Sequence, residues 1–320
     1  MNNIITAKKA SHAKITLLSP GHRACAGCSQ IIAARIVADT LGPNTIITNA
    51  TGCLEVTTTP YPESSWGLPW IHSLFENAAA IASGIQAALN YKSKIENRKS
   101  KISVVAQGGD GATFDIGLGL ISGMWARNEN ILYVCYDNEG YMNTGAQASA
   151  ATAWGANTTT TPVGRIKRHS EMSPSLDAIG SHLLKKDMIA IALAHGLKYV
   201  AQTTVGYPLD ITAKINKAKE INGPSYIQIL VPCIPGWKIE PNQTINLAKL
   251  AGLTGHYPLL EYIDGKLTKA QKISQPQIPV LEYLKPQGRF KHLFKNDVGK
   301  KQLEFIQKLA DENIKKYNLK

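Results

Sequence analysis

The sequence predicts an α/β fold in which a mostly parallel β-sheet is covered by helices on both faces. Several short segments are almost wholly apolar and rich in β-branched residues, which is typical of strands buried on both faces. They alternate with segments whose apolar residues recur at helical spacing. The chain has 320 residues, of which 44% are hydrophobic and 18% charged. It can therefore bury a sizeable core, and intrinsic disorder is excluded.

The first predicted elements are a helix, a strand and a second helix. Apolar residues recur at helical spacing over 29–41, and Gly42-Pro43 ends that pattern. The segment Thr45–Thr48 predicts a short strand. After a loop rich in Thr, Pro and Trp, Asn77 is placed to cap a helix over AAAIASGIQAALNY.

The centre of the chain predicts a strand, a glycine-rich turn, a helix and another strand. The β-branched run Ile102–Ala106 leads into the turn Gly108–Gly111. A helical pattern follows over 113–126, and the apolar segment Ile131–Asp137 predicts the next strand. This order is that of a βαβ unit, which joins parallel strands.

A further strand, helix and strand are predicted over 198–202, 210–221 and 225–231. Beyond Pro232 the periodic signals weaken, and only 300–316 predicts another helix. No internal repeat or low-complexity linker marks a separate domain there. We therefore expect a core domain over 1–235 and an irregular C-terminal extension over 236–320 that packs on the core or on a partner subunit.

Composition limits the classes of protein without choosing among them. Five cysteines are too few for a disulfide scaffold, and the N-terminus shows no export signal, so a cytoplasmic location is expected. No apolar run is long enough to predict a membrane span. The net charge of +12 allows a nucleic-acid surface, an anionic substrate or an acidic partner, but composition favours a solvated basic face over these.

Four of the five cysteines are predicted in loops at the ends of elements. They are Cys25, Cys28, Cys53 and Cys233, whereas Cys135 lies inside an apolar strand and is expected to be an inert buried thiol. A CxxC pair with two distant single cysteines fits a redox dithiol, a zinc site or an iron–sulfur cluster. The cysteines alone leave these three uses open.

A second motif is Gly109-Asp110-Gly111, separated by 26 residues from Asn138. The glycines allow the backbone to approach a pyrophosphate at the start of a helix. Asp110, Asn138 and the carbonyl of Gly140 would supply oxygen ligands to Mg²⁺. A GDG alone is often only a turn, but its pairing with an Asn across a helix and a strand is a thiamine diphosphate signature.

These motifs occur together and in an order that resembles the β subunit of the multi-subunit 2-oxoacid:ferredoxin oxidoreductases, most closely the pyruvate branch. The resemblance is carried by CAGC, TGC at Thr51–Cys53, GDG with Asn138, and YMNTGAQ. It extends almost over the whole chain through PWIHSLFENAAA, ATAWGA, VPCIPGW and EYLKPQGRFKHL.

The resemblance implies a thiamine-diphosphate-binding fold and assigns the site residues. One 4Fe-4S cluster would be bound by Cys25, Cys28, Cys53 and Cys233. Thiamine diphosphate and Mg²⁺ would be held by Cys53, Gly109, Asp110, Gly111, Ala112, Asn138, Gly140, Tyr141, Met142 and Asn143. Asn143 would also be catalytic, by reaching the reacting substrate. Some relatives have an acidic residue where this chain has Gln30, so no cofactor contact is expected there.

The resemblance also implies the reaction and the partners. Pyruvate would be oxidatively decarboxylated with coenzyme A to acetyl-CoA and CO₂, and electrons would pass to ferredoxin in anaerobic metabolism. An α subunit would complete the thiamine site, and γ and δ subunits, one of them ferredoxin-like, would carry electrons away. No nucleic acid and no membrane is expected as a partner.

Two alternatives remain at this stage. The same chemistry could act on a branched-chain 2-oxoacid or on 2-oxoglutarate, although a second substrate carboxylate would require an additional Arg or Lys. A distant alternative is a non-catalytic module, stabilised by zinc, that uses its basic charge to bind nucleic acid.

Overall fold

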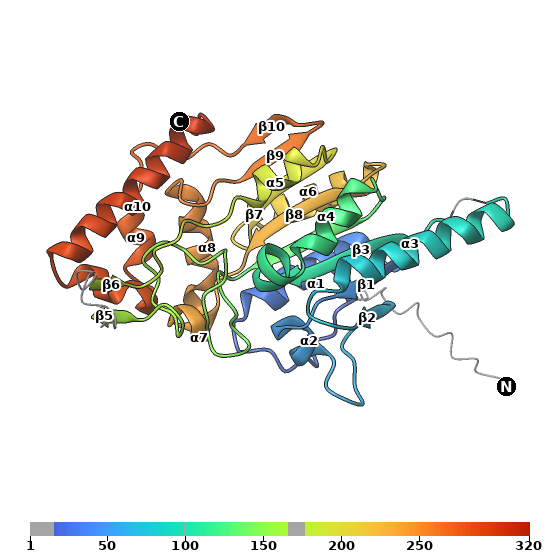
Figure 1. The fold of residues 1–320 in the computed structure, drawn as a ribbon, viewed down its shortest axis with the longest axis horizontal. Coiled ribbons are helices and arrows are strands. Elements are labelled where there is room, and N and C mark those ends of the chain that lie inside the picture. The colour runs from blue at the N-terminus through green and yellow to red at the C-terminus, as the bar shows by residue number, and fades with distance from the viewer. Residues whose placement is uncertain (1–15, 99, 166–176) are drawn as a thin grey trace, which may run out of the picture.

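The computed structural model describes residues 16–98, 100–165 and 177–320. Its centre is an eight-stranded sheet with the order β10-β9-β7-β8-β4-β3-β1-β2 (Figure 1). The first six strands along the chain that join this sheet are parallel to one another, whereas β9 is antiparallel to β7 and β10 is antiparallel to β9. Their bounds are β1 Thr45–Asn49, β2 Trp70–His72, β3 Ser103–Gly109, β4 Leu132–Asp137, β7 Tyr199–Thr204, β8 Ser225–Leu230, β9 Leu260–Ile263 and β10 Lys266–Ala270.

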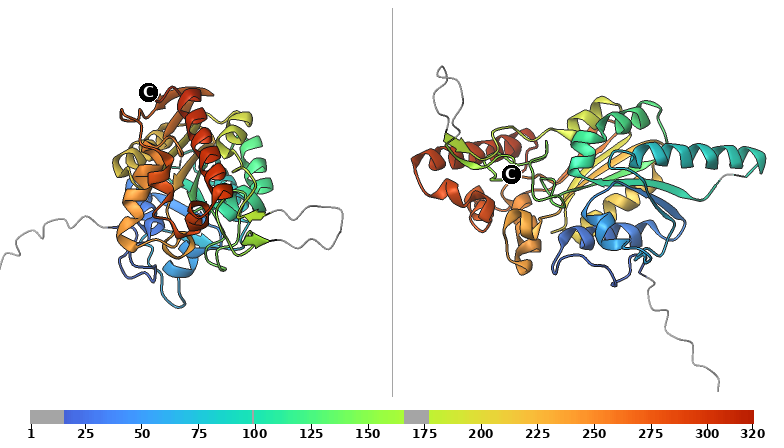
Figure 2. Two further views of the ribbon diagram at one scale, coloured as in Figure 1. Left: turned by 90° about the vertical axis from the view of Figure 1, so that its left-hand side faces the viewer. Right: turned by 60° about the horizontal axis from the view of Figure 1, so that its bottom comes forward.

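Helices cover both faces of the sheet, as predicted (Figure 2). Helices α1 (Ser29–Leu41) and α6 (Pro208–Glu220) pack on one face, against apolar side chains such as Val134 and Ile227. On the other face lie α3 (Ala78–Ile95), α4 (Leu118–Ala126) and α5 (Met188–Ala194). The strands are buried on both sides, which explains why their sequences are almost continuously apolar.

The structure corrects two predictions of secondary structure between β3 and β4. The predicted turn Gly108–Gly111 begins later, because Gly108 and Gly109 still pair with Cys135 and Tyr136 of β4. The helix predicted over 113–126 is divided into a π-helical turn, η1 (Gly111–Ile116), and α4. At the junction, the Gly117 N–H donates to the carbonyl of Ala112 at 3.0 Å.

Asn77 stands directly before α3, but its side chain makes no capping hydrogen bond. The structure also contains short elements that the sequence did not indicate: α2 (Cys53–Thr58), β2, α5 and the antiparallel pair of β5 (Val163–Arg165) and β6 (Asp177–Ile179). In the described part of the chain, no helix combines the length and the hydrophobicity needed to cross a membrane.

The segment after Pro232 is more regular than the sequence indicated. It contains α7 (Ile234–Trp237), η2 (Pro241–Gln243), α8 (Thr244–Leu253), β9, β10, α9 (Val280–Leu284), η3 (Gly288–Phe294) and α10 (Asp297–Lys316). The helices of this segment share an apolar cluster that includes Trp237, Tyr283 and Phe290. The same cluster contains Leu230 of β8, so the extension packs on the core domain.

Candidate active site

The predicted site residues come from loops at one edge of the sheet. The strands β1, β3, β4 and β8 are neighbours and parallel, so their carboxyl ends meet at this edge. In open α/β sheets, ligands bind in the crevice outside the carboxyl ends of the strands. Two adjoining cavities lie there, here named the strand-end cavity and the cysteine cavity.

The strand-end cavity has a volume of about 110 Å³. Nine predicted residues line it: Cys53, Gly109, Asp110, Gly111, Asn138, Gly140, Tyr141, Met142 and Asn143. The predicted residue Ala112 is not among its lining residues, because its side chain is buried in the core beneath α3 and α4. Gln30, Thr51 and Phe75 line the cavity as well.

The Asn138 amide and two oxygens converge at one wall of this cavity. The Asn138 side-chain nitrogen donates to the carbonyl of Gly140 at 2.7 Å and to Oδ1 of Asp110 at 2.9 Å. A cation at this point would take the amide oxygen instead, together with the other two oxygens. A Mg²⁺ ion draws oxygen ligands together at about 2.0–2.1 Å from the metal. The donor set and its spacing therefore fit magnesium.

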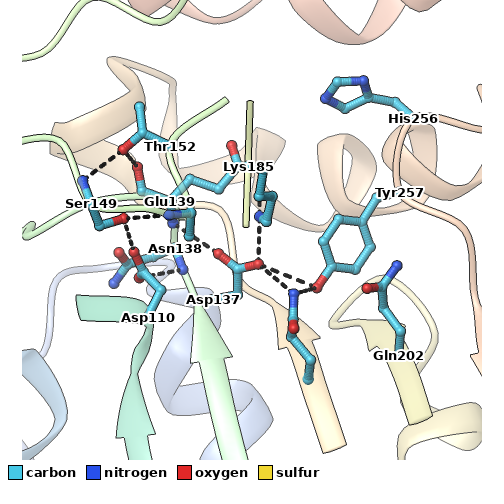
Figure 3. Close-up of polar contacts among 12 residues, drawn as sticks. Asp110, Asp137, Asn138, Glu139, Ser149, Thr152, Lys185, Gln202, His256 and Tyr257 are labelled. Atoms are coloured by element: carbon cyan, nitrogen blue, oxygen red, sulfur yellow. Dashed lines mark hydrogen bonds and ion pairs between the residues drawn. The ribbon is translucent and has the colours of Figure 1, made fainter. Parts of the chain in front are cut away.

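Asp110 is buried beside a second carboxylate. Ser149 Oγ donates to its Oδ2 at 2.5 Å, and the Asn138 N–H donates to its Oδ1 at 3.2 Å (Figure 3). Burial, together with the nearby charge of Asp137, raises the pKa of Asp110 to about 8. A cation bound at this point would favour the ionised carboxylate.

Glycine is required at position 111 by the ring of Tyr141. A Cβ on Gly111 would lie 2.5 Å from Cε1 of that ring. The ring is fixed by its hydroxyl, which donates to Oδ2 of Asp115 at 2.8 Å, and by an edge contact with Phe75. Asp115 and Ser149 thus support the site, although neither carries a motif in the sequence.

The cysteine cavity has a volume of about 190 Å³ and is lined by all four predicted ligands. They are Cys25, Cys28, Cys53 and Cys233, and all are free thiols. Burial first, and then the neighbouring cysteines, raise the pKa of Cys53 to about 11; burial also raises that of Cys233 to about 12. Within the described ranges, no three His, Cys, Asp or Glu side chains are grouped so as to hold a metal ion.

The two cavities share part of their lining. Cys53, Asn138, Met142 and Asn143 line both of them, and so does Gln30. Asn143 is exposed at the rim, in a loop closed by a hydrogen bond from the Tyr141 N–H to the carbonyl of Gln147 at 2.9 Å. The fifth cysteine, Cys135, is fully buried in β4, as predicted, and lines neither cavity.

Exposed apolar side chains occur on two segments next to residues that line the strand-end cavity. Ile71 and Leu74 precede the lining residue Phe75, and Ile116 is the last residue of the π-helical turn. Leu74 is 58% exposed and Ile116 54%.

Comparison with known proteins identifies similar sequences and folds. The family described as thiamine pyrophosphate enzyme, C-terminal TPP binding domain, matches residues 26–229. Pyruvate synthase subunit PorB of Methanosarcina barkeri is 47% identical over 95% of this chain and 97% of its own. The PorB subunit of Methanocaldococcus jannaschii is 48% identical over 93% of this chain and 95% of its own. Ketoisovalerate oxidoreductase subunit VorB of Pyrococcus abyssi is 41% identical over 87% of this chain and 86% of its own.

Among solved structures, a 2-oxoglutarate:ferredoxin oxidoreductase from Magnetococcus marinus, with 2-oxoglutarate, coenzyme A and succinyl-CoA bound, has a similar fold. It superposes with a TM-score of 0.56 at 23% identity, covering 89% of this chain and 92% of that one. This likeness supports the thiamine-enzyme fold that the sequence predicted.

Proposed function

The chain belongs to the thiamine pyrophosphate enzyme family, in its branch of pyruvate synthase PorB subunits, and on that premise we propose that it holds thiamine diphosphate with Mg²⁺ in the strand-end cavity and one 4Fe-4S cluster in the cysteine cavity. As the β subunit of a pyruvate:ferredoxin oxidoreductase, it oxidatively decarboxylates pyruvate with coenzyme A and passes the electrons toward ferredoxin. The observation that carries the proposal is the lining that the two cavities share.

Asp110, Asn138 and the Gly140 carbonyl are the proposed magnesium ligands. The Asn138 amide lies within hydrogen-bonding distance of the other two groups, and turning it over would present three oxygens to a cation. The backbone of Gly109 and Gly111 gives a diphosphate close access, and the N–H groups at the start of η1 favour an anion. Thiamine diphosphate supplies the carbanion chemistry that releases CO₂ from a 2-oxoacid, and the cluster accepts electrons.

The four cysteines are the proposed cluster ligands. A cubane cluster is held by four thiolates, one at each iron corner, and these four thiols line one cavity whose other walls include Ile31, Val231 and Ile234. Apolar walls exclude water from the cluster and influence its potential. Cys53 lines both cavities, so a cluster bound there would adjoin the diphosphate-binding residues.

Asn143 is the proposed catalytic residue of this chain. It lies at the rim of both cavities with its side chain exposed. Its amide can donate to a substrate carboxylate or to an oxygen on the reacting carbon. The neighbouring Met142 lies between the two cavities, where its thioether contributes apolar surface and no charge.

Partner subunits are proposed on two grounds. Thiamine enzymes activate the cofactor ring through a carboxylate, which in this family would come from an α subunit docked over Leu74 and Ile116. The four cavity cysteines suffice for a single cluster, so γ and δ subunits would carry the electrons onward to ferredoxin. Family membership favours this enzyme over the zinc-stabilised module that binds nucleic acid.

Pyruvate is favoured over larger 2-oxoacids by the lining of the strand-end cavity. Among the described residues that form this lining, there is no Lys or Arg to pair with a second carboxylate. The similarity to a VorB subunit keeps branched-chain 2-oxoacids as the second candidate.

The substitution Asp110→Asn tests the magnesium and diphosphate assignment. It keeps the shape of the side chain and removes the charge that would bind the cation, so the magnesium-dependent affinity for thiamine diphosphate should fall at least about 10-fold. Calorimetric titration of the cofactor-depleted complex with thiamine diphosphate and Mg²⁺ measures this affinity. Asp39→Asn, on α1 and outside both cavities, is the matched control. Equal affinity in the wild type and Asp110→Asn would contradict the assignment.

A further inference from the structure

A buried group of charged side chains links the loop after β4 to the rest of the chain. Lys185 Nζ lies 2.5 Å from Oδ2 of Asp137 and 3.1 Å from Oε1 of Glu139 (Figure 3). Arg289 of η3 approaches Oε2 of the same Glu139 at 2.6 Å. Two carboxylates therefore face two cations, and both carboxylates flank Asn138.

This group is buried deeply enough that each charge depends on its partner. The side chains of Glu139 and Arg289 are 1% and 2% exposed. Removing one partner of a buried ion pair leaves an uncompensated charge, which is strongly unfavourable. Gln228 and Tyr257 complete the shell of Asp137 by donating to its Oδ2 at 2.9 and 3.3 Å.

The backbone of the loop is held in an unusual conformation. Glu139 has a φ of +65°, which a residue with a Cβ adopts rarely. Its N–H donates to Oδ1 of Asp137 at 3.2 Å, and its carbonyl accepts from Thr152 Oγ1 at 2.9 Å. With this left-handed turn at Glu139, the Asn138 amide lies 2.7 Å from the Gly140 carbonyl oxygen and 2.9 Å from Oδ1 of Asp110.

Arg289 is itself fixed by the C-terminal extension. Its guanidinium lies 3.7 Å from the centre of the Trp237 ring, and its Nε donates to Gln287 at 2.9 Å. Trp237 in turn donates from Nε1 to the carbonyl of Asn138 at 2.8 Å. The extension therefore contacts the loop twice, through Glu139 and through the backbone of Asn138.

We propose that Arg289 and Glu139 form a positioning pair, which holds the turn Asn138–Gly140 in the conformation that presents its oxygens to Mg²⁺ and the diphosphate. This inference rests on the proposed function. It gives the C-terminal extension a role in cofactor binding, although neither Arg289 nor Glu139 lines the strand-end cavity. Substitution of a group that orients a metal ligand typically lowers metal affinity by about 10- to 100-fold.

The test uses the complete complex, depleted of thiamine diphosphate and magnesium. Thiamine diphosphate is titrated at a series of Mg²⁺ concentrations, and binding is followed by calorimetry, for the wild type, Arg289→Met, Glu139→Gln and the double variant. Each single substitution should raise the Mg²⁺ concentration needed for half-maximal binding by about 10- to 100-fold. The double variant should show no larger effect than the worse single variant, because the two residues act as a unit.

A matched control distinguishes a role in positioning the magnesium ligands from a role in stability alone. Lys214→Met removes a buried cation that pairs with Asp210 on α6, and Lys214 lines neither cavity. It should lower the midpoint of unfolding in denaturant while leaving the Mg²⁺ requirement unchanged. If Arg289→Met fails to assemble, the same titration is carried out on Arg289→Lys. This variant keeps the charge but loses the planar group stacked on Trp237, so it too should raise the Mg²⁺ concentration needed for half-maximal binding.

The outcomes distinguish this inference from the proposed function. A raised Mg²⁺ requirement in the Arg289 and Glu139 variants, with Lys214→Met unchanged, supports the positioning pair. Variants that are less stable but bind thiamine diphosphate at the wild-type Mg²⁺ concentration overturn it and leave the proposed function intact. A wild-type complex that binds no thiamine diphosphate, or binds it without Mg²⁺, overturns both.

Discussion

Burial raises the pKa of the groups that would bind metals in both cavities. The pKa of Asp110 is about 8 and that of Cys53 about 11, and for each of them desolvation is the largest cause. Metal ligands bind as the deprotonated form, so the bound cation or cluster must compensate for their burial. These side chains are consistent with a site whose charges are balanced only when its cofactors are present.

The motifs of the sequence predicted the residues that line the two cavities but not the residues that support them. The four cysteines, Asp110 and Asn138 stand in recognisable spacings at strand ends, and the structure places them around the two cavities. Ser149 and Arg289 reach Asp110 and Glu139 from 39 and 150 residues away. Contacts over such separations depend on the folded chain, and no local pattern in the sequence marks them.

The substitution Cys53→Ala is expected to abolish the iron–sulfur cluster. A cubane that loses one of four thiolates has an open corner, and Cys53 also forms part of the wall next to the strand-end cavity. Iron content and visible absorption, both measured on anaerobically purified complex, should fall by more than about half. The control variant Cys135→Ala should keep the wild-type iron content and visible absorption, because Cys135 lies outside the cavities. A full cluster in Cys53→Ala would show that this ligand is wrongly assigned.

The elements next to the site explain where the predicted secondary structure was right and where it was wrong. Buried strands such as β4 and helices with a regular apolar face such as α1 were predicted almost to the residue. The π-helical turn η1 was predicted as part of an α-helix, because its sequence pattern fits one. In the structure the Gly117 N–H instead donates to the carbonyl of Ala112, five residues back. Such turns occur frequently at functional sites.

Two glycine substitutions compare a crowded position in η1 with an open one in α3. Gly111→Ala should destabilise the protein by about 1–3 kcal/mol, because its Cβ would press on the Tyr141 ring. Gly84→Ala should stabilise it by about 0.5–1 kcal/mol, because nothing lies within 4 Å of its Cβ and Ala suits a helix interior. Denaturant unfolding of the two variants measures both changes. A neutral Gly111→Ala would contradict the packing described for Tyr141.

The sheet as a whole was predictable except at its two edges. Its buried parallel strands carry the strongest sequence signal, whereas the short strand β2 lies in a predicted loop, β10 is largely exposed and rich in Lys, and β9 is only partly buried. The antiparallel pairing of β9 with β7 and of β10 with β9 is set by tertiary contacts rather than by an apolar run. For the same reason the sequence indicated an irregular extension where the structure has helices around Trp237 and Phe290.

On the function proposed above, the chain forms one half of a reaction centre, whose candidate cofactor-binding edge adjoins the segments that carry the exposed side chains of Leu74 and Ile116. The central claim is that thiamine diphosphate and a cluster lie side by side at this edge and act on pyruvate together. An anaerobic visible absorption spectrum of the purified complex, recorded before and after the addition of pyruvate and coenzyme A, tests it most directly. We predict a broad iron–sulfur absorption that bleaches only when both substrates are present. A colourless complex, or an absorption that pyruvate and coenzyme A leave unchanged, would contradict the claim.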